Sequence, residues 1–466
     1  MPRSPRPGSL VLGYVAGAAD LVDAIVDRIA DGALADGDRI PSSRALAEQT
    51  GLSRGTVVRA FDELVAAGFV VSEHGSGTCV SAGAVQAAQA GARTRGRDDA
   101  GPGPDVERRR GRSQRDLRPG IPDAALVDGR AWRSAMRAAA AAGLSGLNPW
   151  EEPSPTLRAA LSGHLRRHRG IAEADPILFD SSRSAVAALC AAFAAHRPVV
   201  FHIEDPGYRG AVLMAREHGL PVRFHPADPD GLDVANLGDE PTIVFTTPAH
   251  QYPLGYRVSV DRRVALVEWA RRTGSLVIED DYDGEFRYGV APLPALVTLP
   301  GGDESVAYVG TSSKSVSPDL RVAWCLPPTA LRRDVERWLA VHRRGPSSVP
   351  ADALAEFIGS GAMDRHLARA ARVYSDRRAR LVAALGRECP DLAVTGVEAG
   401  LHLCVLLPER DDDEVVRTLE AAGWRTRSLS SQSSQHAVSG LVLNYARLGG
   451  RDAGEFASAL RVILES

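Results

Sequence analysis

The sequence is almost without lysine: of its 55 lysine and arginine residues, only Lys314 is a lysine. It also has no surplus of positive charge. The formal net charge is −3 at pH 7, so any contact with nucleic acid must come from a local group of arginines. No apolar run approaches the roughly 20 residues that a membrane span needs, and the first residues do not form a signal peptide. We therefore expect a cytoplasmic protein without a membrane partner.

The five cysteines are spread along the chain without the close pairs that a zinc or redox site requires. We expect them to be buried, reduced thiols, as in proteins of a reducing compartment. They are Cys79, Cys190, Cys325, Cys389 and Cys404.

Length and composition indicate a globular protein with more than one structural unit. The 466 residues can bury a sizeable core, and the 44% hydrophobic and 24% charged residues are ordinary proportions. Residues 82–116 consist almost entirely of Ala, Gly, Gln, Pro, Arg and acidic residues, without apolar periodicity. We therefore predict a first domain at residues 14–82, a flexible linker at 83–116 and a second domain at 117–466.

Three helices are predicted in the first domain. An amphipathic helix at residues 20–30 is followed by a turn, and Ser42 is a suitable N-cap for a second helix that ends before Gly51. A third helix begins at Ser53. Two helices joined by a tight glycine turn form a helix-turn-helix. The expected core positions of the first and third helices are Leu21, Ile25, Val26, Ile29, Ala60, Phe61, Leu64 and Val65.

A β-hairpin is predicted after the third helix, from strands at residues 69–72 and 78–81 around the turn EHGSG. Residues 39–80, RIPSSRALAEQTGLSRGTVVRAFDELVAAGFVVSEHGSGTCV, resemble the winged helix-turn-helix of the GntR family. The resemblance implies that double-stranded operator DNA is a partner. The residues expected on the DNA-facing surface are Arg39, Ser42, Arg44, Ser53, Arg54, Thr56, Arg59, Gly75 and Gly77.

The charge of this first block is a test of that interpretation. Residues 1–81 carry more acidic residues than arginines, which would ordinarily argue against nucleic acid. The arginines at positions 39, 44, 54 and 59 nevertheless fall on the surface that the motif turns to DNA, whereas most acids lie on or after the first helix. The alternative is that these arginines are solvated charges on helix faces.

The second domain is predicted to have an α/β fold. Short β-branched runs, at residues 198–203, 242–246, 275–278 and 306–309, alternate with helical stretches. This alternation is typical of a mostly parallel central sheet flanked by helices. The last third is rich in helices and returns to strands near its end, so we expect a smaller C-terminal α+β lobe.

Lys314 follows the apolar strand at residues 306–309 by a few positions, where side chains project from a strand end into a cleft. A lysine amine can form an imine with a carbonyl compound, whereas a guanidinium cannot. Seven residues after the lysine, Arg321 is expected to open another strand. Hydroxyl residues around the lysine, together with Arg321, suit a phosphate dianion. The alternative is a surface lysine left by chance in an arginine-rich sequence.

A second strand end, at residues 277–283 (VIEDDYD), brings several carboxylates and a phenol together. Like charges repel at such a place unless a cation or a protonated heterocycle relieves them. No histidine lies nearby to complete a transition-metal set, and we predict no metal site, although an oxygen-only magnesium site is the competing explanation.

Four ordered motifs resemble the MocR subfamily of GntR regulators, in which a winged helix is fused to a domain similar to fold type I aminotransferases. They are EDPGY at residues 204–208, TPAHQYP at 247–253, EDDYDGEFRY at 279–288 and GTSSKSVSPDLR at 310–321. The resemblance implies that pyridoxal 5'-phosphate (PLP) is the cofactor. By the same resemblance Lys314 forms the Schiff base, Asp280 pairs with the pyridinium nitrogen, Tyr282 hydrogen-bonds the ring hydroxyl, Tyr208 stacks on the ring, and Thr311 and Arg321 bind the phosphate.

The sequence departs from the family pattern at the phosphate turn. Ser182 stands where a glycine usually approaches the phosphate, and the neighbouring Arg183 is expected to compensate by its charge. Residues 148–153 replace an earlier glycine-containing segment, and Leu254 replaces a small hydroxyl residue. Cofactor affinity and the shape of the substrate side therefore remain open at this point.

A further departure concerns activity. Aminotransferases of this fold generally bind the substrate α-carboxylate with an arginine near the last core strand, where this sequence has Val442. Arg447 is out of register, and Arg209 is a weaker candidate for an anionic ligand. Efficient transamination of α-amino acids is not favoured, so we expect a protein that is not an enzyme.

Three functions remain possible from the sequence. The favoured one is a transcription regulator, a head-to-tail homodimer, in which PLP bound as an aldimine is the effector or receives an amino-compound effector. The second is a genuine PLP-dependent aminotransferase. The third is a regulator whose aminotransferase-like domain has lost PLP and serves only for dimerisation.

Overall fold

The chain forms two compact units, Met1–Arg112 and Ser113–Ser466, which are treated separately. A computed structural model describes residues 10, 12, 15–73, 77–89, 115–142, 154–195, 197–289, 293–435 and 438–465. Among the helices within these ranges, none has the length and apolar character needed to cross a membrane.

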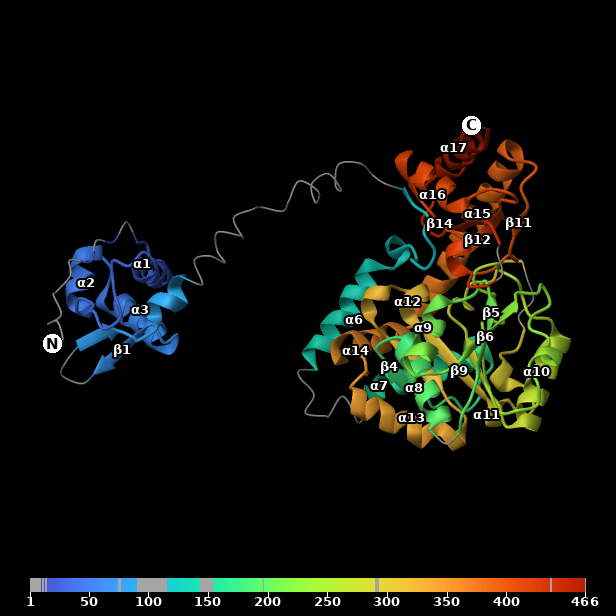
Figure 1. The fold of residues 1–466 in the computed structure, drawn as a ribbon, viewed down its shortest axis with the longest axis horizontal. Coiled ribbons are helices and arrows are strands. Elements are labelled where there is room, and N and C mark those ends of the chain that lie inside the picture. The colour runs from blue at the N-terminus through green and yellow to red at the C-terminus, as the bar shows by residue number, and fades with distance from the viewer. Residues whose placement is uncertain are drawn as a thin grey trace. The chain divides into compact units, whose positions relative to one another are not determined.

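The first unit contains the three predicted helices and a β-hairpin (Figure 1). Its elements are α1 (Ala18–Ala30), α2 (Ser43–Thr50), α3 (Arg54–Ala66), β1 (Val70–Glu73) and β2 (Gly77–Val80). The side chains of Ser42 and Ser53 cap α2 and α3 by accepting hydrogen bonds from the amides of Ala45 and Thr56, as the sequence indicates for these helix starts. The antiparallel pairing of β1 with β2 forms the predicted hairpin.

The core of the first unit agrees with most of the predicted positions. All four expected residues of α1 are buried, and in α3 Ala60 and Leu64 are buried. The prediction for Val65 is wrong, because its side chain is 43% exposed, and Val57 is buried instead. Positions 57, 60 and 64 share one face of a helix with 3.6 residues per turn, whereas position 65 lies about 100° away from Leu64.

The predicted start of the linker at residue 83 also needs correction. Residues 84–89 are helical, and Ala84 and Ala88 are buried in the core of the first unit. These alanines are four residues apart and therefore share a helix face, and alanine is the best helix former. At the other end, β3 (Arg115–Asp116) pairs in parallel with β13 (Trp424–Arg425). The remaining stretch assigned to the linker, residues 90–114, lies outside the described residues.

A seven-stranded sheet forms the centre of the second unit, in the order β4-β10-β9-β8-β7-β5-β6. Its strands are β4 (Ile177–Phe179), β5 (Phe201–Asp205), β6 (Val222–Pro226), β7 (Ile243–Thr246), β8 (Leu276–Asp280), β9 (Val306–Thr311) and β10 (Ala323–Leu326). The pairs from β6 to β9 are parallel, and β10 runs antiparallel to both β9 and β4. The predicted mostly parallel α/β sheet is confirmed.

Both faces of this sheet are buried. Along β9 and β10, Tyr308 and Trp324 point into one hydrophobic cluster, and their neighbours Val309 and Cys325 point into another. Strand side chains alternate between faces, so continuous apolar runs are what a sheet covered on both sides requires. Figure 1 shows helices surrounding these strands. The covering helices are α6 (Gly129–Ala141), α7 (Pro155–Arg169), α8 (Ser182–Ala194), α9 (Arg209–Glu217), α10 (Val260–Thr273), α11 (Gly302–Ser305), α12 (Ser312–Ser315), α13 (Thr329–His342) and α14 (Ser348–Gly359).

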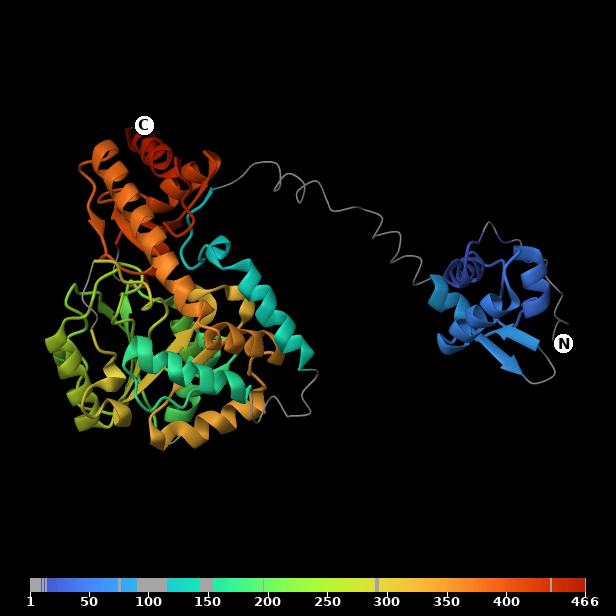
Figure 2. The same cartoon turned by 180° about the vertical axis from the view of Figure 1, so that it is seen from behind.

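The expected smaller C-terminal lobe contains a four-stranded antiparallel sheet in the order β11-β12-β15-β14. Its elements are β11 (Val394–Thr395), β12 (His402–Leu406), α16 (Asp412–Ala421), β14 (Arg427–Ser428), β15 (Gly440–Asn444) and α17 (Asp452–Glu465). Figure 2 shows the long helix α15 (Ala362–Glu388) running from the large lobe to this lobe. The short 3-10 helices of the second unit are Ala124–Leu126, Val234–Asn236, Leu296–Thr298, Pro318–Leu320 and Ser430–Gln432.

Candidate functional site

A cavity of about 800 Å³ lies at the carboxyl ends of the parallel strands of the large sheet. This edge is where ligands bind in open α/β sheets. The cavity is lined by all seven residues predicted to hold PLP. These residues lie at the ends of different strands, after them, or at the start of α8. They are Ser182, Arg183, Tyr208, Asp280, Tyr282, Thr311 and Arg321, and Lys314 lines it with them.

The amine of Lys314 lies at the inner end of the cavity. Its Nζ donates a hydrogen bond of 2.8 Å to the carbonyl oxygen of Gly120. Burial lowers the pKa of Lys314 from its ordinary value, although the negative charges of Asp280 and Asp283 act against this shift. A lowered pKa increases the fraction of neutral amine, which is the nucleophilic form.

The carboxylates at the end of β8 each have a different environment. Asp281 forms an ion pair with the buried Arg169 and accepts a hydrogen bond of 2.6 Å from the Tyr308 hydroxyl. Glu279 accepts from the backbone amides of Leu296 and Val297. These partners explain how the repulsion inferred from the sequence is relieved for two members of the cluster.

Asp280 is the exception in this cluster. Its Oδ1 is buried and has no hydrogen-bond partner among the described residues. Burial and the nearby charges of Asp281 and Asp283 raise its pKa from 3.8 to about 7, against the opposing effect of Lys314. A buried acceptor without a donor is costly, so this oxygen is a place where a bound cationic donor would be stabilised.

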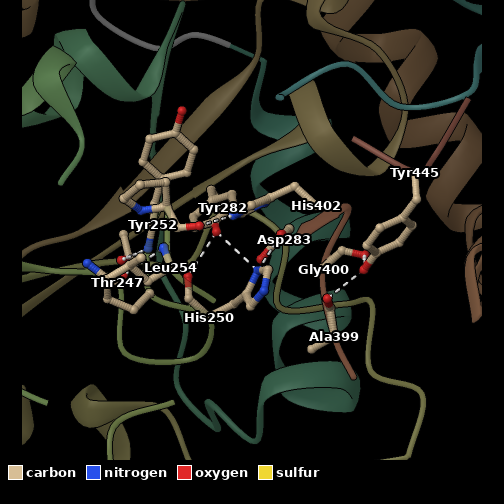
Figure 3. A network of polar contacts seen from close by, with 12 residues as sticks. Thr247, His250, Tyr252, Leu254, Tyr282, Asp283, Ala399, Gly400, His402 and Tyr445 are labelled. Atoms are coloured by element: carbon tan, nitrogen blue, oxygen red, sulfur yellow. Dashed lines mark hydrogen bonds and ion pairs between the residues drawn. The ribbon is translucent and has the colours of Figure 1, made fainter. Parts of the chain in front are cut away.

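Tyr282 is held by the loop after β7 (Figure 3). Its hydroxyl donates to the carbonyl oxygen of His250 at 2.9 Å and lies 3.1 Å from His250 Nδ1. The same Nδ1 lies 3.0 Å from an oxygen of Asp283. His250 is therefore a structural group that fixes the phenol at the cavity wall, as is usual for a lone histidine in a strand-end loop. The sequence left its role undecided.

Tyr208 forms another part of the wall. Its ring stacks on that of Phe245 with a centroid distance of 6.1 Å and meets the edge of Tyr252 at 6.2 Å. Its hydroxyl accepts a hydrogen bond of 3.3 Å from Arg183 Nε. Tyr208 thus packs against the apolar cluster with one part of its surface and lines the cavity with another.

The predicted phosphate end lies at the N-terminus of α8, where the Ser181 side chain caps the helix by accepting from the Ser184 amide. Unpaired helix amides and the helix dipole favour an anion there. Arg321 Nη2 lies 3.4 Å from a carboxylate oxygen of Asp180. The expectation that Arg321 opens a strand is wrong: it follows the 3-10 helix Pro318–Leu320 with a left-handed φ of 53°, and β10 begins at Ala323. The altered segment at residues 148–153 lies outside the described residues.

The expected carboxylate position has an apolar environment. Val442 is fully buried in a cluster with Leu254, Cys404 and Leu429. Arg209 Nη1 instead donates to the carbonyl of Ser433, and Arg447 is exposed. Within the described residues, the substrate side is lined by neutral groups such as Tyr252 and His402. Burial and the neighbouring His250 hold the pKa of His402 well below its usual range.

The first unit presents a second candidate surface. The four predicted arginines are exposed on α2, on α3 and before α2. Arg44 pairs with Glu48 at 3.4 Å, and Thr56 shares a hydroxyl contact of 2.8 Å with Ser53 at the start of α3. Gly77 has a φ of 93°, which favours glycine at the base of the wing. Gly75 lies outside the described residues. The arginines among these residues are Arg39, Arg44, Arg54 and Arg59.

Comparisons with known proteins identify the families of both parts of the chain. The family model for bacterial regulatory proteins of the gntR family matches residues 18–80, and the model for aminotransferase class I and II matches residues 127–429. The chain is 32% identical to the HTH-type pyridoxine biosynthesis transcriptional regulator PdxR of Corynebacterium glutamicum, over 88% of this chain and 87% of the relative. It is 30% identical to the probable rhizopine catabolism regulatory protein MocR of Rhizobium meliloti, over 91% of this chain and 88% of the relative.

Solved structures share the fold of the second unit. One is Pyrococcus horikoshii kynurenine aminotransferase in complex with PMP, with a TM-score of 0.69 and 21% identity over 77% of this chain and 93% of that chain. At this identity the likeness shows the fold alone. Together with the two family models and the regulators that match along most of their length, it supports the resemblance seen in the motifs. The chain belongs to the MocR subfamily of GntR-type transcription regulators, in which a helix-turn-helix is fused to an aminotransferase class I and II domain.

Proposed function

We propose that this transcription regulator binds PLP in the cavity of its second unit, on Lys314, and that the bound cofactor controls how the first unit binds double-stranded operator DNA. The observation that carries the proposal is the buried, unpartnered Oδ1 of Asp280 beside a cavity that also contains the only lysine of the chain. When bound, PLP supplies an aldehyde that combines with amines and a protonated pyridine ring that withdraws electrons.

The residues around the cavity fit this cofactor. A pyridinium N–H would give Asp280 the donor that its Oδ1 lacks, and would stabilise the ionised carboxylate. Lys314 would hold the cofactor covalently through its amine. Tyr282, fixed by His250, would present its hydroxyl to the ring, and Tyr208 would cover the ring face.

The phosphate would lie at the N-terminus of α8. Ser182 and Arg183 begin this helix, and the same cavity is lined by Thr311, at the end of β9, and by Arg321, in the turn before β10. A serine in place of the usual glycine still has a backbone N–H, so the helix start can still bind the anion. The guanidinium groups add positive charge to the same place. These assignments are part of the proposal.

We also propose that the protein is not an efficient α-amino-acid aminotransferase. Support comes from Val442, which is buried among Leu254, Cys404 and Leu429 where a carboxylate-binding arginine is expected. The effector would then be PLP itself or an amino compound that joins it. Coupling to DNA would act through a homodimer, with a head-to-tail arrangement as the expectation from the family.

The test of PLP binding uses the full-length protein incubated with PLP. We expect a visible absorbance that borohydride abolishes, and peptide mass spectrometry should place the reduced adduct on Lys314, the only side-chain amine of this kind in the chain. Lys314→Ala should remove both signals. A wild-type protein that takes up no added PLP would contradict the proposal and favour a domain that serves only for dimerisation.

A second measurement separates regulation from catalysis. The PLP-loaded protein is mixed with a panel of α-amino acids and amines lacking a carboxylate, and conversion to the pyridoxamine form is followed by absorbance. Slow or absent conversion is expected. Conversion of α-amino acids at typical enzymatic rates, on the order of 1 to 10³ per second, would instead favour a genuine aminotransferase.

A further inference from the structure

A cluster of two histidines and one carboxylate lies outside the cofactor cavity, where helices α7 and α15 meet. His164 and His168 are four residues apart on α7, so they share one helix face, and their ring centroids are 4.5 Å apart. Asp364 stands in the first turn of α15. One ligand atom from each of these three residues lies within 4.8 Å of the other two.

The hydrogen-bonding capacity of the His164 ring is not used by its neighbours. Its side chain is 1% exposed, and neither ring nitrogen has a hydrogen-bond partner among the described residues. Oε1 of Glu285 lies 3.9 Å from Nε2, which is beyond hydrogen-bond range. A buried imidazole normally uses at least one nitrogen, so this side chain points to a ligand that the protein alone does not supply.

The outer part of the cluster is open to solvent. Nε2 of His168 lies 2.8 Å from Oδ1 of Asp364, and the two side chains are 31% and 41% exposed. Arg167 approaches only the other carboxylate oxygen of Asp364, at 3.8 Å. The cluster therefore extends from the partly exposed side chains of His168 and Asp364 to the buried ring of His164.

We propose that His164, His168 and Asp364, with Glu285 as a fourth donor, bind a divalent transition-metal ion of the Zn²⁺ type. Two imidazole nitrogens and carboxylate oxygens form a donor set that suits Zn²⁺, and two histidines at a spacing of four on one helix are a known way to present them. Metal–ligand distances of about 2.0 to 2.2 Å require the ligand atoms to draw closer together, which rotation of the two half-exposed side chains provides.

The consequence of such an ion is a cross-link between three segments. It would join α7 to α15 and to the segment that begins with Asp280 and contains Glu285. This site does not depend on PLP, because none of its ligands lines the cofactor cavity. The sequence did not indicate this cluster, because Asp364 is 196 residues from His168 along the chain.

A rival cluster of His250, Asp283 and His402 is a weaker candidate. His250 Nδ1 already contacts both Asp283 and the Tyr282 hydroxyl, and His402 Nε2 lies 3.1 Å from the carbonyl oxygen of Pro253. Occupation by a metal would break the contacts that fix the cavity wall. Binding at this rival place is one of the outcomes that the experiment distinguishes.

The experiment measures Zn²⁺ binding to the full-length, chelator-treated protein by competition with a chromophoric chelator, and Co²⁺ is used as a spectroscopic probe of the ligands. We expect one ion per chain. His168→Ala and Asp364→Asn should each weaken binding by at least about tenfold. The matched control is His342→Ala, which removes an exposed histidine from helix α13.

His164→Asn tests the buried ligand and should abolish binding of the first ion. Because this change alters a buried side chain, circular dichroism checks that the variant is folded, and the variants of the two partly exposed ligands give an independent answer. The proposal is overturned if no stoichiometric Zn²⁺ binds. It is also overturned if the affinity is unchanged in His168→Ala and Asp364→Asn, which would place the ion at the rival cluster or on cysteine.

Discussion

The amine of Lys314 and the backbone of Gly120 are in direct contact: the Nζ hydrogen bond to the Gly120 carbonyl is 2.8 Å long, and a Cβ added at Gly120 would lie 3.0 Å from the same nitrogen. Gly120 has a φ of 97° and stands four residues after β3. The chain that enters the second unit thus passes over the lysine, held on one side by the pairing of β3 with β13.

This contact predicts the effect of Gly120→Ala. The added methyl group would crowd the amine and hinder its access to PLP, so PLP uptake should weaken by about tenfold, or about 1.4 kcal/mol. The matched control is Gly274→Ala, since Gly274 also has a left-handed φ, of 67°, but nothing lies within 4 Å of its added Cβ. The measurement is the borohydride-sensitive absorbance during a PLP titration. Equal uptake by the two variants would show that the contact does not limit access.

Asp280 predicts a pH dependence of stability. Its pKa in the folded protein, about 7, is above the ordinary value of 3.8, so the folded state binds the proton more tightly than the unfolded state. The contribution of Asp280 to the free energy of unfolding is therefore largest at low pH. It is lost as pH rises from about 4 to about 7, because the buried group then has to ionise. In Asp280→Asn this loss should be smaller by the contribution of Asp280.

The measurement is urea unfolding of PLP-free wild type and variant at about pH 5 and about pH 8. Glu204 and Glu279 also have pKa values raised to about 7 by burial, but they are common to both proteins, so the difference between them isolates Asp280. Bound PLP should remove from the wild-type loss the part that Asp280 contributes. A constant difference across this range would contradict the assignment of an unpartnered carboxyl group.

Much of this site could be predicted from the sequence because its residues follow strands directly. Apolar runs of four to six residues identified β7, β8 and β9, and the carboxyl ends of parallel strands meet at one edge of a sheet. Asp280 and Lys314 were therefore expected together before their geometry was known. The starts of α2 and α3 could also be predicted, because the caps Ser42 and Ser53 each act on the helix that they begin.

The parts that were missed depend on contacts between distant segments. Arg169 belongs to the run RRHR at the end of α7, which looks like a solvated face, yet its side chain is buried and paired with Asp281. Tyr282 is held by the backbone carbonyl and the ring of His250, and the sequence around His250 does not indicate this role. The direction of β10 could not be predicted either. The turn through Arg321 makes β10 antiparallel to β9, and no local sequence signal specifies that reversal.

The buried ion pair of Arg169 and Asp281 predicts an asymmetric effect on stability. Arg169→Met would leave Asp281 charged and buried with only the Tyr308 hydroxyl, and should lower the free energy of unfolding by about 3–5 kcal/mol. The double variant Arg169→Met, Asp281→Leu removes both charges and should be less destabilised than the single variant. Thermal unfolding of the PLP-free proteins checks this order. A double variant that loses the sum of both single effects would mean that the pair contributes little coupling.

The exposed arginines of α3 predict how the first unit binds DNA. Arg54→Ala and Arg59→Ala should weaken binding to a duplex selected from a random library, by about 1–3 kcal/mol where the arginine contacts a base edge. A phosphate contact would instead weaken all duplexes alike and reduce the slope of log K against log salt by about one. Electrophoretic mobility shifts over a series of salt concentrations distinguish the two cases.

The control for this experiment is Arg28→Ala on α1, because Arg28 is partly exposed, pairs with Asp31 at 2.9 Å and lies on a helix that carries three acidic residues. Its removal should leave both affinity and salt slope unchanged. If Arg54→Ala and Arg59→Ala behave like Arg28→Ala, the arginines of α3 are solvated charges, and DNA must be bound by another surface. If only the two α3 variants change, the local arrangement of arginines outweighs the acidic balance of this part of the chain, since charges beyond about 10 Å are largely screened at moderate salt.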